Sequence, residues 1–101
     1  MFLFTIEAEV NPKAKYSAEW SDIGGAYVNC YVSFKNFEIA EKIAKWAIRD
    51  SGWIVRKRTE ASKLQRSKLT TKKEIQYYAE ALKYGYCLVF YTWPADEMKE
   101  N

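Results

Sequence analysis

The chain has 101 residues and contains no histidine, an absence that excludes several kinds of chemistry. Histidine is the usual general base near neutral pH and the commonest metal-binding side chain in proteins. Because only two cysteines are present, the chain cannot assemble a four-ligand structural zinc site by itself. No serine or cysteine has a histidine to activate it as a nucleophile. We therefore expect a non-catalytic protein that holds no cofactor and no metal.

The chain also lacks the long apolar runs that mark membrane proteins. Its longest apolar run, Tyr86–Trp93, has the length of a β-strand, whereas a membrane-spanning helix needs about 18 or more apolar residues. Residues Met1–Val10 have no basic leader and alternate like a strand, so we expect no signal peptide. These features predict a cytoplasmic protein with no membrane partner.

The two cysteines, Cys30 and Cys87, lie in separate apolar stretches, one in each half of the chain. They could form a disulfide only if these stretches were neighbouring strands. The alternative, which we favour, is a pair of buried free thiols in a reducing compartment.

The chain contains few residues that break helices and strands, since it has only four glycines and two prolines. Hydrophobic residues make up 49% of it. This length is typical of one domain, and it is sufficient for one hydrophobic core. We expect a single α/β domain over residues 1–94 and a solvated C-terminal tail over residues 95–101.

Alternation of apolar and polar side chains predicts four strands. In the first strand the side chains of Phe2, Phe4, Ile6, Ala8 and Val10 point to one side, and those of the intervening residues point to the other. The four predicted strands are Phe2–Val10, about Ala26–Phe34, Trp53–Thr59 and Tyr86–Trp93.

A first amphipathic helix is predicted after Asn36, a favoured N-cap residue, and runs to about Asp50. Gly52, just beyond that end, is typical of a helix C-terminus. The side chains expected to face the core recur with helical spacing and are Ala40, Ile43, Ala44, Ala47 and Ile48.

A second helix is predicted over about Lys72–Tyr84. Thr71 and Glu74 have the spacing of a capping box, and Gly85 follows the last turn. Its expected core-facing residues are Ile75, Tyr78, Ala79 and Leu82.

The predicted element order is strand, strand, helix, strand, helix, strand. Two strand–helix–strand units with right-handed crossovers would place both helices on one face of a four-stranded mixed sheet. We therefore predict a two-layer α/β sandwich of the α+β class. A ferredoxin-like arrangement is the alternative, if residues 59–70 contain a further strand.

That arrangement leaves the second face of the sheet without a helix. The last strand is nevertheless apolar on both sides, which is typical of a strand that is buried on both faces. Either the long connection Asn11–Gly25, which contains Trp20 and Ile23, folds over this face, or a second chain does.

Charge is concentrated in one segment. Residues 56–73 contain eight basic residues and one acid, so they carry +7, whereas the rest of the chain carries −4. Either the segment is a solvated linker, or it binds a polyanion such as single-stranded RNA or DNA, with Tyr27 and Tyr31 stacking on bases. The candidate anion-binding residues are Arg56, Arg58, Lys63, Arg66, Lys68, Thr71, Lys72 and Lys73.

Aromatic residues point to a different function. Trp46 lies outside the core-facing stripe of the first predicted helix, on a ridge with Ile39. Large aromatic side chains that a small core does not require are typical of protein interfaces. We predict that Ile39, Trp46, Tyr27 and Tyr31 bind a protein partner or a second copy of the chain, and we keep nucleic-acid binding as the alternative function.

Overall fold

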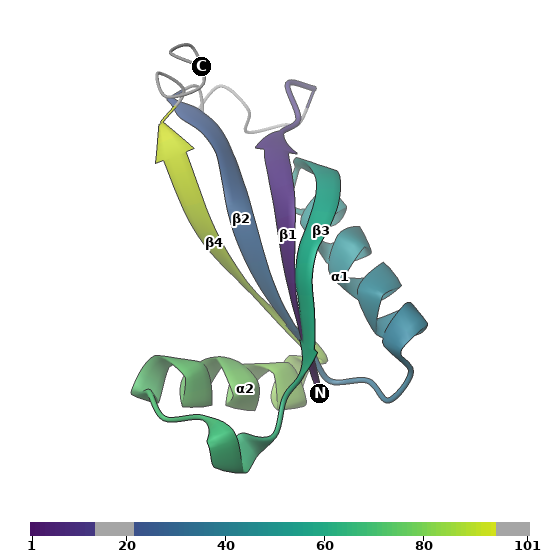
Figure 1. Ribbon diagram of the computed structural model, residues 1–101. Helices are drawn as coiled ribbons and strands as arrows, with labels where there is room; N and C mark the ends of the chain where they lie inside the picture. Colours follow the sequence, from purple (N-terminus) through teal and green to yellow (C-terminus); the bar gives the residue numbers. More distant parts are fainter. Residues whose placement is uncertain (14–21, 95–101) are drawn as a thin grey trace.

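The computed structural model describes residues 1–13 and 22–94, which form four strands, two α-helices and one 3-10 turn. The predicted order of strands and helices is confirmed. Along the chain the elements are β1 (Phe2–Val10), β2 (Ile23–Val32), α1 (Phe37–Asp50), β3 (Trp53–Lys63), η2 (Arg66–Lys68), α2 (Lys72–Tyr84) and β4 (Tyr86–Pro94), as Figure 1 shows.

The four strands form one sheet in the order β3-β1-β2-β4, and every neighbouring pair is antiparallel. The prediction of a mixed sheet was therefore wrong. β2 and β3 run parallel to each other but are separated by β1, so α1 connects them across β1. β3 and β4 lie at opposite edges and run antiparallel to each other.

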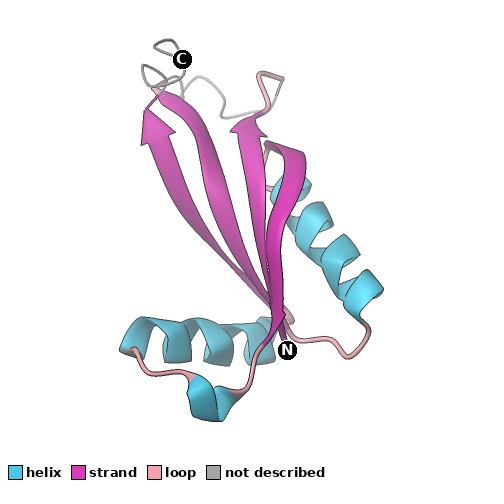
Figure 2. Cartoon of the chain, in the orientation of Figure 1, coloured by secondary structure: helices cyan, strands magenta, loops and turns pink. Residues whose placement is uncertain are grey.

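The two helices lie on opposite faces of the sheet, so the prediction that both cover one face was also wrong. α1 packs on the face of the sheet that carries the side chains of Phe4, Ile6 and Val28, together with the other strand residues that point to the same side. We call this face the α1 face and the opposite one the α2 face. α2 packs on the α2 face, where Ala81 meets Tyr31 and Cys87. Figure 2 shows α1 running alongside the sheet and α2 crossing its lower end.

The positions of the helices follow from the strand directions. The right-handed crossover rule applies to parallel strands, and it governs β2, α1 and β3. The end of β3 and the start of β4 lie at the same end of the sheet, because Lys63 and Tyr86 both align with Phe2 through the pairings of β1 and β2. The connection between them therefore does not have to run the length of the sheet, and α2 crosses that end.

The main core lies between α1 and the sheet. Ala40 and Ala44 are small enough to let α1 approach the strands closely, and both are completely buried. At the amino-terminal end of α1 the ring of Phe37 makes edge contacts of 5.4 Å with the rings of Phe2 and Phe4. The prediction of the core-facing stripe of this helix is confirmed, with Ala47 and Ile48 also buried.

Caps predicted for each of the two helices are present. The side chain of Asn36 accepts a hydrogen bond from the backbone N–H of Ile39 at 3.0 Å. Gly85 ends α2 with a φ of 95°, a backbone conformation that glycine adopts without strain.

The orientation of α2 differs from the prediction. Tyr77 and Ala81 face the sheet, whereas Ala79 is exposed and Leu82 is 60% exposed. Ala81 allows close approach to the sheet, and the Tyr77 ring packs against that of Tyr31 at 5.6 Å. The predicted stripe of Ile75, Tyr78, Ala79 and Leu82 therefore does not form the main contact of this helix with the sheet.

β3 is longer than the prediction, because it continues from Thr59 to Lys63. Its pairing with β1 shifts register twice, between Thr5 and Ile6 and between Glu7 and Ala8. Residues 59–70 therefore form the end of β3 and η2. They do not form the further strand that a ferredoxin-like arrangement required.

Gly24 and Gly25 lie inside β2, where the pairing with β4 shifts register between Ile23 and Gly25. The indole ring of Trp93 covers Gly25 and packs against the Tyr27 ring at 5.0 Å. A Cβ atom at Gly25 would lie 2.9 Å from Cε2 of Trp93 and 3.0 Å from the carbonyl oxygen of Ala8. Glycine is therefore required here by the close approach of the indole ring.

We predict that Gly25→Ala lowers the free energy of unfolding by about 1–3 kcal/mol, because the Trp93 ring must move away from Gly25 and Tyr27. Urea denaturation measures this change. In a Trp93→Val background the same substitution should cost less, because the clashing ring is gone. An equal cost in both backgrounds would contradict this packing.

Candidate functional site

The two edges of the sheet differ in their chemistry. β3 carries Arg56, Lys57 and Arg58 in succession, and its pairing with β1 is irregular at two points. Charged side chains and bulges are the devices that prevent an edge strand from pairing with another chain. β4 has the sequence YCLVFYTWP, contains no charged residue, and pairs with β2 without a break from Trp93 to Tyr86.

The pairing of β4 with β2 determines which backbone groups of β4 point away from β2. The backbone N–H of Ser33 donates to the carbonyl of Gly85 at 2.9 Å, so these residues form a hydrogen-bonded pair. Hydrogen-bonded pairs alternate along an antiparallel ladder. The N–H and C=O groups of the intervening residues therefore point away from β2, and we call this set, at Tyr86, Leu88, Phe90 and Thr92, the β4 edge. No other strand of the described residues pairs with it.

Exposed aromatic side chains flank the β4 edge on both faces of the sheet. On the α1 face, Trp46 is 54% exposed, and its ring meets that of Tyr86 edge-on at 6.2 Å. On the α2 face, Tyr91 is 54% exposed and lies directly opposite Tyr27 in the pairing of β4 with β2. An added strand would therefore meet aromatic surface on either side.

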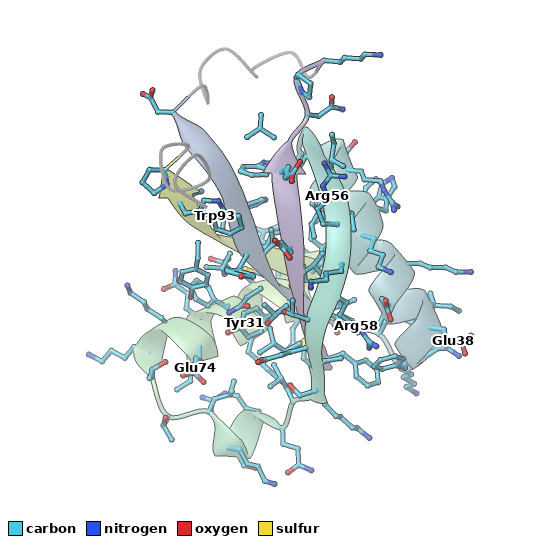
Figure 3. All side chains as sticks on the ribbon, turned by 45° about the horizontal axis from the view of Figure 1, so that its top comes forward. Tyr31, Glu38, Arg56, Arg58, Glu74 and Trp93 are labelled. Atoms are coloured by element: carbon cyan, nitrogen blue, oxygen red, sulfur yellow. The ribbon has the colours of Figure 1, made fainter. Side chains whose placement is uncertain are left out.

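The structure separates the predicted protein-interface residues into three places. Ile39 and Trp46 are exposed on α1, and Tyr27 is exposed on the α2 face. Tyr31 is only 4% exposed, because α2 covers it, and Figure 3 shows it near Glu74 on the α2 side of the sheet. Trp46 lies beside Tyr86 of β4 and Tyr27 lies opposite Tyr91 of β4, on the two faces of the sheet, and pairing at the β4 edge was not predicted. The sequence signal for it was the absence of charge in Tyr86–Trp93.

Part of the basic segment is engaged within the chain. The Arg56 guanidinium pairs with the carboxylate of Glu9, and this pairing raises the pKa of Arg56. Arg58 lies 3.6 Å from Glu41 and stacks over the Phe37 ring at 5.4 Å. Figure 3 shows both arginines projecting from β3, so these two predicted anion-binding residues have partners in their own chain.

The remaining cations of the predicted site lie close together along the chain. They extend from the end of β3 through η2 to the first turn of α2. None of them pairs with a carboxylate among the described residues. We call this group the basic end; it consists of Lys63, Arg66, Lys68, Lys72 and Lys73.

Thr71 has a structural role at the start of α2. Its hydroxyl accepts a hydrogen bond from the Glu74 backbone N–H at 3.1 Å, and it contacts the Glu74 carboxylate at 3.0 Å. The predicted pairing of Thr71 with Glu74 is present, although the Glu74 carboxylate accepts from the Thr71 hydroxyl in place of the backbone N–H of a standard capping box, and it places a carboxylate at the helix N-terminus. The side chain of Thr71 is therefore already used, and the carboxylate of Glu74 opposes the binding of another anion there.

The two cysteines lie on neighbouring strands but on opposite faces of the sheet, and both are free thiols. Burial raises the pKa of Cys30 to about 12. Burial and the hydrogen bond that Cys87 donates to Glu80, at 3.2 Å, raise the pKa of Cys87 to about 12 as well. Both side chains are therefore protonated near neutral pH, where a thiol is a weak nucleophile.

Among the described residues, no three metal-ligating side chains lie close enough to hold an ion. None of the helices described is both long and apolar enough to cross a membrane. Comparisons with models of protein families, with curated proteins and with solved structures found no match to this chain.

The buried Cys30 thiol lowers the free energy of unfolding as the pH becomes alkaline. Its pKa rises from 9.0 to about 12 on folding, so between these values the folded chain keeps a proton that the unfolded chain loses. The free energy of unfolding therefore falls as pH rises above about 9, by up to about 1.4 kcal/mol per pH unit for this group.

We predict that Cys30→Ala reduces this alkaline loss of stability, measured by urea titrations between about pH 8.5 and about pH 10.5. Val28→Ala is the control, because Val28 is equally buried but does not titrate. It should keep the full alkaline slope. Equal slopes for Cys30→Ala and the unmodified chain would contradict the assignment.

Proposed function

We propose that this protein is a non-catalytic, cytoplasmic protein-binding module that docks an extended strand on the β4 edge. The observation that carries the proposal is the contrast between the two edges of one sheet. β3 has charges and register shifts, whereas β4 is uncharged and regularly paired over its length. The two buried free thiols support a reducing compartment.

Strand addition uses groups that the β4 edge already presents. The outward N–H and C=O groups of Leu88 and Phe90 lie at the centre of the strand, where an incoming strand can form successive backbone hydrogen bonds. Such bonds supply affinity, and side-chain contacts on the two faces supply specificity. Trp46 and Tyr91 provide those contacts, since each is about half exposed and stands beside the edge.

The test is a quantitative pull-down with the double variant Tyr91→Lys/Thr92→Lys. Both residues are exposed, so the variant adds charge to the edge without opening the core. We expect a loss of about tenfold or more in specifically retained protein, as a loss of about 1.4 kcal/mol in binding free energy produces.

The matched control is Ser62→Lys/Gln65→Lys, which adds the same charge at exposed positions at the end of β3 and just beyond it. Retention by this control should equal that of the unmodified chain. If the chain is monomeric and both double variants retain the same proteins, the proposal is wrong.

A second candidate function is the binding of single-stranded nucleic acid, and the basic end favours it. Its five cations have no described carboxylate partner, so they are available to phosphates. The exposed rings of Tyr27 and Tyr91 support base stacking. Against it, these rings lie on β2 and β4, whereas the basic end begins at β3 on the opposite edge of the sheet.

A titration with a labelled single-stranded oligonucleotide at two salt concentrations tests this candidate. Binding should weaken steeply with salt, and replacing Lys63, Arg66 and Lys68 by glutamine should reduce the slope of log K against log salt by about 2. The control replaces Lys35, Lys42 and Lys83 by glutamine and should leave the slope unchanged. No binding at low salt, or salt-independent binding, removes the candidate.

A further inference from the structure

We infer that the strand docked on the β4 edge is β4 of a second copy of this chain, paired antiparallel about a two-fold axis that passes at Val89. This inference rests on the proposed function of the β4 edge and names its partner. The product is a continuous antiparallel sheet of two copies, in which the two β4 strands lie at the centre and the two β3 strands form the outer edges.

Charge selects this pairing among those that two copies can form. β4 has no charged side chain, so two β4 strands bring no like charges opposite each other. Two β3 strands would bring Arg56, Lys57 and Arg58 of each copy together. Pairing β4 with β3 of another copy would meet the register shifts of β3 and would leave free edges that add further copies. Of these pairings, only β4–β4 leaves the charged, irregularly paired β3 strands as the two outer edges.

The direction of the strands agrees with this arrangement. A two-fold axis perpendicular to the sheet makes the two β4 strands antiparallel, which continues the pattern of the whole sheet. The interface is then isologous, so each copy contributes the same residues. An unrelated partner strand would have to match the apolar side chains of β4 on both faces by its own sequence.

The outward-pointing backbone groups of β4 define the register. Residues that point their N–H and C=O groups outward must form the hydrogen-bonded pairs across the new interface. The axis at Val89 is the one that uses all four outward-pointing residues, since it sets Leu88 opposite Phe90 of the second copy and Tyr86 opposite its Thr92. Registers centred on Leu88 or Phe90 leave one of the four without a counterpart.

This register has a consequence for the side chains. Val89 lies on the α2 face and stands opposite its own counterpart in a pair without backbone hydrogen bonds, where Cα atoms approach to about 4.5 Å. On the α1 face, the small side chain of Thr92 lies opposite Tyr86 of the second copy, beside that copy's exposed Trp46. The second copy therefore covers the ring of Trp46, and the residue that it brings next to this ring, Thr92, is small.

Disulfide trapping with Val89→Cys tests the register, because a cysteine pair at this spacing can form a disulfide. The native Cys30 and Cys87 are buried, so the unmodified chain gives the baseline. Thr92→Cys is the control on the same strand, since its side chain faces Tyr86 of the second copy and is about 20 Å from its own counterpart, six residues along extended strands. We expect a covalent dimer with Val89→Cys and none with Thr92→Cys under non-reducing conditions.

Light scattering on the unmodified chain tests the partner without any substitution. We expect the mass to rise from one chain to two with concentration, and Tyr91→Lys/Thr92→Lys to remain at one chain. The chain could keep the mass of one copy at all concentrations while the double variant still loses the proteins retained in the pull-down. That result would overturn the second copy as the partner and would leave the proposed function standing. A single-chain mass with unchanged retention overturns both. A dimer trapped by Thr92→Cys and not by Val89→Cys overturns the register.

Discussion

The backbone of an open antiparallel sheet must satisfy or protect the hydrogen-bonding groups at its two edges, and this chain treats the two edges differently. β3 is protected by a run of cationic side chains and by two register shifts against β1. β4 has neither device, although it is nine residues long and apolar on both faces. The proposed function depends on this difference, because an unprotected apolar edge is a surface for pairing with another strand.

The same sheet explains where the helices lie. α1 covers the α1 face and encloses the main core, whereas α2 crosses one end of the α2 face and encloses a smaller cluster around Tyr31 and Cys87. Beyond α2, the α2 face remains open at Tyr27 and Tyr91. Of the long connection that was expected to cover this face as the alternative to a second chain, Ile23 belongs to β2 and packs with the α1 core, and Trp20 lies outside the described residues.

Local features could be predicted from the sequence, because local chemistry determines them. Asn36, Thr71 and Gly85 fix the ends of the helices through hydrogen bonds and backbone conformation. The side of α2 that packs on the sheet could not be predicted. The amphipathic stripe of the helix pointed to the side that contains Leu82, whereas Ala81 and Tyr77, on another side, fit against the sheet. Strand order depends on long-range pairing, and the roles of Arg56 and Arg58 depend on carboxylates brought by β1 and α1.

Hydrogen exchange of the β4 amides, followed at several protein concentrations, tests the central claim most directly. The amides of Cys87, Val89 and Tyr91 point to β2 and should be protected at every concentration. Those of Leu88, Phe90 and Thr92 point outward and should exchange quickly in dilute solution and become protected as concentration rises. If these three amides exchange quickly at all protein concentrations, and also when a partner protein is added, no strand pairs with the β4 edge and the central claim is wrong.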